Sequence, residues 1–169
     1  MQISWSLNGV PVLNRPHVSE EQKRNNSLLP LYPHSIGVMD DAMDHRALRV
    51  YLIEDSLHVR DLLLDFLNTP GEVEIVGFAD NENESVAAIL ADPVDAVIVD
   101  LNLREGSGMG VIKQLRGAAL DPQPNLIVLT NHPFPAIRQR AMQLGANYFF
   151  DKSADYASLE ATLLSLHVH

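Results

Sequence analysis

The sequence has 169 residues, 46% of them hydrophobic and 20% charged, which suits one domain of ordinary size with room for a tail. It contains no cysteine, so disulfide frameworks, thiolate catalysis and cysteine-ligated metal sites are excluded. Its 12 basic and 22 acidic residues give a net charge of −10, which disfavours direct binding to nucleic acid. No apolar run is long enough to span a membrane, and the start does not resemble a secretory signal, so we expect a cytoplasmic protein.

The first part of the chain lacks a regular pattern of hydrophobic residues. Several prolines interrupt it, and no period of 2 or 3.6 is sustained. A segment without an apolar face cannot offset the entropy lost on ordering. We therefore predict a disordered extension over residues 1–46 and a folded domain over residues 47–169. Two alternatives remain open, namely a short strand around Trp5 and a translation start at Met39 or Met43.

From Leu48 onward, apolar runs rich in β-branched residues alternate with segments of helical spacing. The expected strands are residues 48–53, 73–78, 94–99, 126–129 and 147–150. Candidate N-caps precede three of the helical segments, and these are Ser56, Asn81 and Ser153. Gly145 follows the fourth helical segment, at a position where helices commonly end. The apolar stripe after Ser56 consists of Val59, Leu62, Leu63, Phe66 and Leu67.

Five strand–helix repeats with short connections predict a parallel sheet covered by helices on both faces. The third and fourth runs are almost continuously apolar, which is typical of strands buried on both sides. We therefore expect an α/β fold with a doubly wound, five-stranded parallel sheet in the order 2-1-3-4-5. In such a sheet, ligands bind at the carboxyl ends of the strands, near strands 1 and 3.

Polar residues follow the strands that would meet at this edge. Glu54 and Asp55 follow the first run, Asp100 the third, Thr130 the fourth and Lys152 the fifth. Each one alone fits an ordinary helix cap or loop residue. Together, however, the three carboxylates would crowd like charges unless a cation compensates them. Because the available donors are oxygens, Mg²⁺ fits such a site better than zinc does.

Four segments now resemble the receiver domain of two-component response regulators, over essentially all of residues 47–168. They are VYLIEDS, VIVDLNLREGSG, LIVLTN and GANYFFDKS. Asp55, Asp100, Thr130 and Lys152 are separated by 45, 30 and 22 residues, and these gaps are similar to those of the family. The resemblance implies the flavodoxin-like (βα)5 receiver fold.

The resemblance also implies a metal site and a phosphoacceptor. Asp100 would accept a phosphoryl group from a phosphohistidine donor, which forms an aspartyl phosphate. Asp55 would bind Mg²⁺ directly, Glu54 would assist through water, and Asp100 itself would be a ligand. Asn102 lies where the family uses a backbone carbonyl as a further metal ligand.

Three further residues match positions with roles in the family. Thr130 and Lys152 would contact oxygens of the phosphoryl group. Phe149 falls at the position of the switch aromatic, whose rotamer follows the threonine, although plain core packing is an equal alternative. Asn131 and Arg104 depart from the residues usual in the family, but neither removes a group that the chemistry requires.

The resemblance implies a phosphoacceptor rather than an enzyme that acts on a separate substrate. Its partners would be a sensor histidine kinase or a histidine phosphotransfer protein, and a downstream target protein. We expect a stand-alone receiver, because only one helix fits between Lys152 and His169. The main alternative is a receiver-like adaptor that binds a partner without phosphorylation. A flavoprotein of the same architecture is disfavoured because Glu54 and Asp55 would repel its phosphate. An acid-loop phosphatase is disfavoured because it needs a second carboxylate two positions after the nucleophilic aspartate, where this sequence has Asn102.

Overall fold

The computed structural model describes residues 4–5, 11–12 and 46–167, which belong to two units, Met1–Asp41 and Ala42–His169. In the first unit, β1 (Ser4–Trp5) pairs with β2 (Pro11–Val12) in an antiparallel arrangement. Trp5 therefore lies in a strand. Apart from Arg46, the rest of the predicted extension, including both alternative start methionines, lies outside the described residues, so the prediction of disorder is untested.

The second unit is organised around a five-stranded parallel sheet. Its strands are β3 (Leu48–Ile53), β4 (Val73–Ala79), β5 (Ala96–Val99), β6 (Asn125–Thr130) and β7 (Tyr148–Asp151). They are arranged in the order β4-β3-β5-β6-β7, and all neighbouring pairs are parallel. This order is 2-1-3-4-5 when the five strands are counted along the chain, so the predicted topology is confirmed.

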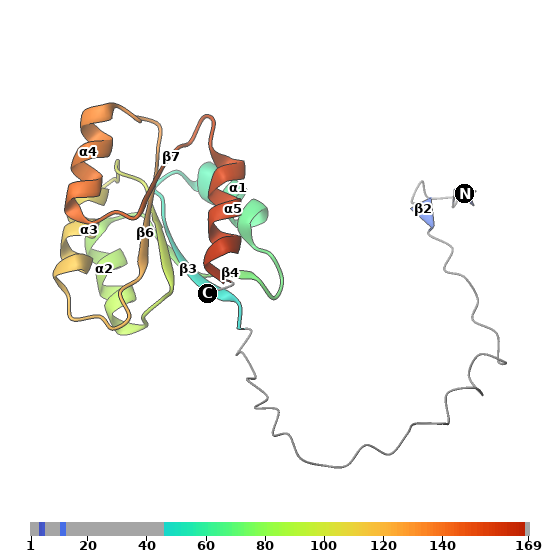
Figure 1. Ribbon diagram of the computed structural model, residues 1–169, viewed down its shortest axis with the longest axis horizontal. Helices are drawn as coiled ribbons and strands as arrows, with labels where there is room; N and C mark the ends of the chain where they lie inside the picture. Colours follow the sequence, from blue (N-terminus) through green and yellow to red (C-terminus); the bar gives the residue numbers. More distant parts are fainter. Residues whose placement is uncertain (1–3, 6–10, 13–45, 168–169) are drawn as a thin grey trace, which may run out of the picture. The chain divides into compact units, whose positions relative to one another are not determined.

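Five helices cover the two faces of this sheet. They are α1 (Leu57–Leu67), α2 (Glu82–Ala91), α3 (Gly108–Gly117), α4 (Pro135–Leu144) and α5 (Tyr156–His167). Helices α2, α3 and α4 lie on one side of the sheet, and α1 and α5 lie on the other (Figure 1). The longest described helix has 12 residues, and none of those described could cross a membrane.

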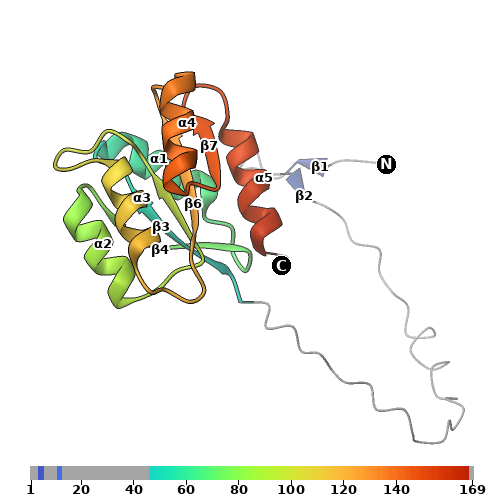
Figure 2. The ribbon, with the colours of Figure 1, turned by 60° about the vertical axis from the view of Figure 1, so that its left-hand side comes forward.

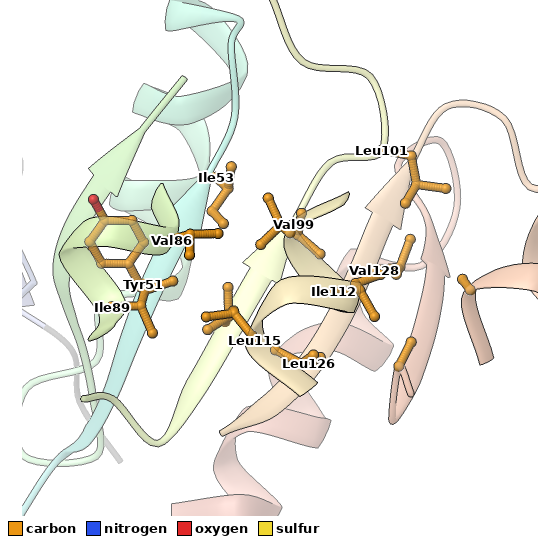
Figure 3. Close-up of a cluster of buried hydrophobic side chains, with 14 of the residues drawn as sticks. Tyr51, Ile53, Val86, Ile89, Val99, Leu101, Ile112, Leu115, Leu126 and Val128 are labelled. Carbon is orange, nitrogen blue, oxygen red and sulfur yellow. The ribbon is translucent and has the colours of Figure 1, made fainter. Parts of the chain in front are cut away.

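Side chains along the central strands alternate between two apolar layers, as the period of 2 requires. In β3, Tyr51 and Ile53 face α2 and α3, whereas Val50 and Leu52 face α1 and α5. Figure 3 shows the first layer, in which Val86, Ile89, Ile112 and Leu115 pack against strand residues including Val99 and Val128. Each fully buried aliphatic side chain of this kind contributes about 1.5–3 kcal/mol through removal from water.

Local signals at the helix ends are mostly confirmed. The Ser56 hydroxyl accepts a hydrogen bond from Val59 N, and the Asn81 side chain accepts one from Glu84 N. Gly145 ends α4 in the left-handed conformation, with φ of 110°. The prediction for Ser153 is wrong, because α5 begins only at Tyr156. The backbone N–H and hydroxyl of Ser153 both donate to the Asp151 carboxylate, which closes the turn that leads to the helix.

The apolar stripe of α1 is also only partly buried. Leu63 and Leu67 are fully buried, whereas Leu62 is 46% exposed and Phe66 is 39% exposed. The predicted stripe is wider than the part of the helix surface that the sheet and α5 cover. Sequence periodicity gives the direction of the buried face but not its width.

Candidate functional site

Three carboxylates converge at the carboxyl ends of β3 and β5. Glu54 and Asp55 directly follow β3, and Asp100 directly follows β5. The two strands are paired in register, with Ile53 opposite Val99, and Asp100 N donates to the Ile53 carbonyl at 2.9 Å. One oxygen from each of the three carboxylates lies within 4.8 Å of the other two. The parallel topology therefore brings together side chains that lie more than 40 residues apart in the sequence.

Lys152 joins this cluster from the end of β7. Its Nζ donates to Glu54 Oε2 at 2.5 Å and to Asp100 Oδ2 at 2.6 Å. Glu54 is 2% exposed, and Asp100 and Lys152 are each 6% exposed, so these ion pairs are removed from solvent. Asp55 is half-buried beside them. One ammonium thus pairs with two of the three carboxylates in a largely buried site.

The charges of Glu54 and Lys152 respond differently to this burial. Burial raises the pKa of the Glu54 carboxyl, and hydrogen bonding to Lys152 only partly opposes that effect. Burial by itself would lower the pKa of Lys152, but the hydrogen bonds to Asp100 and Glu54 outweigh it and raise the pKa. The ammonium is therefore firmly held in its charged form, whereas the excess negative charge is borne by the carboxylates.

The donor set fits a hard divalent cation. Lys152 occupies only one oxygen of Glu54 and one of Asp100. The second oxygens, Glu54 Oε1 and Asp100 Oδ1, accept longer hydrogen bonds from Ser56 N at 3.1 Å and Asn102 N at 3.2 Å. The carboxylate of Asp55 adds two further oxygens next to them. Oxygen ligands with an uncompensated negative charge are what Mg²⁺ prefers in proteins.

Thr130 and Asn102 are connected to each other through His132. Thr130 ends β6 and is fully buried, and its carbonyl accepts a hydrogen bond from Lys152 N at 3.0 Å. The Asn102 side chain points to His132, with 2.9 Å between Asn102 Nδ2 and His132 Nδ1. His132 N in turn donates to Thr130 Oγ1 at 3.3 Å. The contact between Asn102 and His132 is absent from the sequence prediction, although the position of His132 two residues after Thr130 is the signal that could have indicated it.

Phe149 does not lie with the charged residues. It is 3% exposed and belongs to the apolar layer on the α2–α4 side of the sheet. Arg138 of α4 covers its ring, with the guanidinium carbon 4.8 Å from the ring centroid, and donates to the Phe149 carbonyl at 2.8 Å. The predicted packing role therefore agrees with the geometry.

A comparison with known families identifies this arrangement. The family model described as the response regulator receiver domain matches residues 50–164, which is more than half of the chain. The chain belongs to this family. Receiver domains are the phosphoacceptors of two-component signalling, and Mg²⁺ binding and phosphorylation are general to them. The cluster of Glu54, Asp55 and Asp100 is compatible with both properties.

Solved structures of receiver domains share the fold. A LuxR-family two-component response regulator from Aurantimonas is 24% identical, with a TM-score of 0.65, over 72% of this chain and 86% of that one. The response regulator domain of CheB from Thermotoga maritima is 23% identical, with a TM-score of 0.62, over 73% of this chain and 95% of that one. The receiver domain of a sensor histidine kinase from Pseudomonas aeruginosa is 19% identical, with a TM-score of 0.62, over 73% and 99% of the two chains. That last structure holds a magnesium ion coordinated in its active site cleft.

Proposed function

We propose that this receiver domain accepts a phosphoryl group on Asp100 in a Mg²⁺-dependent reaction in the cytoplasm. The donor is a phosphohistidine on a sensor histidine kinase or a histidine phosphotransfer protein. One observation carries the proposal: the Asp100 carboxylate is bound to the Lys152 ammonium at 2.6 Å and lies next to the carboxylates of Glu54 and Asp55. This arrangement combines a nucleophilic carboxylate, a fixed cation and an oxygen-rich metal site.

The transfer itself requires little covalent chemistry from the protein. An oxygen of Asp100 forms a bond to phosphorus while the bond between phosphorus and the donor imidazole nitrogen breaks. A carboxylate is already anionic at neutral pH, so no general base is needed. Catalysis then depends on positioning and on neutralising the negative charge of the phosphoryl oxygens. Asp55, Asp100, the Asn102 carbonyl and, less directly, Glu54 would hold Mg²⁺, which would supply part of that neutralisation.

Lys152 and Thr130 stabilise the phosphorylated form of the protein. Lys152 already contacts Asp100, so its ammonium can pair with a phosphoryl oxygen after a small displacement. The Thr130 oxygen accepts a hydrogen bond from His132 N, and its own proton can therefore be donated to another phosphoryl oxygen. Both interactions strengthen as charge is added to Asp100, and they stabilise the product.

Phosphorylation then acts by shifting an existing conformational equilibrium. The hydrogen bond from Thr130 to the phosphoryl group displaces the Thr130 side chain. This displacement is transmitted to Phe149, which lies on the same side of the sheet in the neighbouring strand β7. The face formed by α4, β7 and α5 changes, and with it the affinity for a downstream target protein or for the next member of a phosphorelay. A protein partner is favoured over nucleic acid because the net charge of the chain is −10.

The proposal is tested by incubating the full chain with acetyl phosphate, with and without Mg²⁺, and measuring the intact mass. We expect the wild type to gain one phosphoryl group only when Mg²⁺ is present, and the Asp100→Asn variant to gain none. Asp151→Asn is the matched control, because Asp151 is an acidic residue beside Lys152 whose carboxylate binds Ser153 instead. Wild type that stays unmodified, or Asp100→Asn that is modified equally, contradicts the proposal and favours the unphosphorylated adaptor.

A further inference from the structure

The carboxylate of Glu82 connects three parts of the domain. Glu82 is the first residue of α2, and α2 and α3 lie side by side (Figure 2). Glu82 Oε2 accepts a hydrogen bond from Ser107 N at 2.8 Å, and Oε1 accepts one from Gln114 Nε2 at 2.6 Å. The backbone N–H of Glu82 donates to the Glu105 carbonyl at 3.1 Å. Helix α2 is thereby tied to α3 and to the loop that runs from Asp100 to α3.

Two glycines make room for this carboxylate. A Cβ at Gly106 would overlap the Cβ of Glu82, and a Cβ at Gly110 would overlap its carboxylate. Gly106 also has a φ of 80°, which side chains other than glycine rarely adopt. The close fit shows that the loop and the first turn of α3 are shaped around Glu82.

The start of α3 in turn rests on the backbone of Asp100. Gly108 N donates to the Leu101 carbonyl at 3.1 Å, and a Cβ at Gly108 would overlap the carbonyl oxygen of Asp100. Ser107 is the N-cap of α3, because its hydroxyl accepts a hydrogen bond from Gly110 N at 3.0 Å. A displacement of Ser107 is therefore transmitted directly to the residue that carries the reactive carboxylate.

We propose that Glu82 is a positioning residue for the phosphoacceptor loop. By binding Ser107 N, it holds α3 against the Asp100 backbone, so that the Asp100 carboxylate and the Asn102 carbonyl keep the separation that a metal ion requires. Hydrogen bonds from backbone N–H groups to a carboxylate are stronger than those to neutral acceptors, which suits such a role. This inference rests on the proposed function, since it assigns Glu82 to the same metal site.

The test uses the full chain and compares Glu82→Ala with Glu82→Gln and Glu84→Ala. Hydrogen exchange of the Ser107 and Gly108 amides reports on the loop, and an NMR titration with Mg²⁺ gives the concentration for half-saturation. For Glu82→Ala we expect at least about tenfold faster exchange and about fivefold weaker Mg²⁺ binding. Glu82→Gln keeps an oxygen for Ser107 N, and its amide can pair with a reoriented Gln114 side chain, so both values stay within about twofold. Glu84→Ala removes the same charge from the same turn without touching the loop, so it leaves both values unchanged.

Three results would overturn the inference. They are unchanged exchange and Mg²⁺ binding in Glu82→Ala, equal losses in Glu84→Ala, and a loss in Glu82→Gln as large as that in Glu82→Ala. If Glu82→Ala does not fold, Glu82→Asp replaces it, because the shorter side chain cannot reach Ser107 and Gln114 together. Neither readout requires phosphorylation. A wild type that binds Mg²⁺ but is never phosphorylated would therefore refute the proposed function while these measurements still decide the role of Glu82.

Discussion

The two edges of the sheet use the same kinds of charged residue in opposite ways. At the amino edge, Arg46 donates to both oxygens of Asp95 at 2.8 and 2.7 Å, and Arg49 binds Asp92 at 2.6 Å. Each of these carboxylates has a guanidinium partner, and the pairs are open to solvent. At the carboxyl edge, three carboxylates lie together, and the ammonium of Lys152 forms buried ion pairs with two of them, Glu54 and Asp100.

The pKa shifts follow this difference. Burial by itself would raise the pKa of Asp95, but hydrogen bonds from Arg46 and Arg49 outweigh it and lower the pKa. The pKa of Glu54 is raised instead, because burial is not offset by its share of one ammonium. Charge balance and burial, rather than residue type, therefore distinguish the two edges: the carboxylates of the amino edge are compensated, whereas those of the carboxyl edge retain an excess of negative charge.

The largest expected effect comes from removing the ammonium that pairs with the carboxyl-edge cluster. Lys152→Met leaves Glu54 and Asp100 buried without a cation, so we expect the free energy of unfolding at pH 7 without Mg²⁺ to fall by about 3 kcal/mol. Mg²⁺ should restore part of the loss, because it compensates the same carboxylates. Urea unfolding with and without Mg²⁺ measures both effects, and Lys113→Met, which changes an exposed lysine of α3, is the matched control. A loss no larger than that of the control would mean that the buried ion pairs of Lys152 stabilise the fold no more than an exposed lysine does.

A smaller loss of stability is expected when a methyl group is added at the amino edge without any change of charge. Gly145 has a φ of 110°, and a Cβ there would lie 2.7 Å from Arg116 Cγ, whose guanidinium donates to the Gly145 carbonyl at 2.9 Å. Gly145→Ala should therefore lower the free energy of unfolding by about 2 kcal/mol. Gly117→Ala is the control, since it has no atoms within 4 Å of the added Cβ and no positive φ. Mg²⁺ binding should be unchanged in both variants. Weaker Mg²⁺ binding in Gly145→Ala would contradict the claim that the amino edge contributes only to stability.

The fold was predictable from the sequence because the short apolar runs of the strands differ clearly from the helical spacing of hydrophobic residues between them. The order of the sheet and the convergence of Glu54, Asp55, Asp100 and Lys152 follow from parallel topology, which places the carboxyl ends of all strands at one edge. No knowledge of side-chain contacts is needed for this step. The position of each residue after its strand is sufficient.

Other features depend on contacts between elements that sequence periodicity does not report. The exposure of Leu62 and Phe66 depends on how much of α1 its neighbours cover. The pairing of Asn102 with His132 joins two loops, and the reach of Glu82 to Ser107 depends on the packing of α2 against α3. Ser153 is of a residue type that favours N-caps, but its backbone N–H donates to the Asp151 carboxylate, and the helix begins later.

The smallest expected effect concerns a single charge at the amino edge. Asp95→Asn should lower the free energy of unfolding at pH 7 by about 1 kcal/mol, the upper end for solvent-exposed ion pairs, because solvent screens the pair with Arg46. The pKa of Asp95 is lowered in the folded state, so its stabilisation is present above its ordinary value of 3.8 and is lost as the pH falls through the folded pKa. The difference between wild type and variant in urea unfolding should therefore narrow from pH 7 to pH values below 3.8. Asp92→Asn is the control, because Asp92 is exposed and its loss should not be measurable. A difference that is independent of pH would show that Asp95 stabilises this edge by packing rather than by its charge. An equal loss in Asp92→Asn would show that the exposed pair with Arg49 stabilises this edge as much as the pairs of Asp95 do.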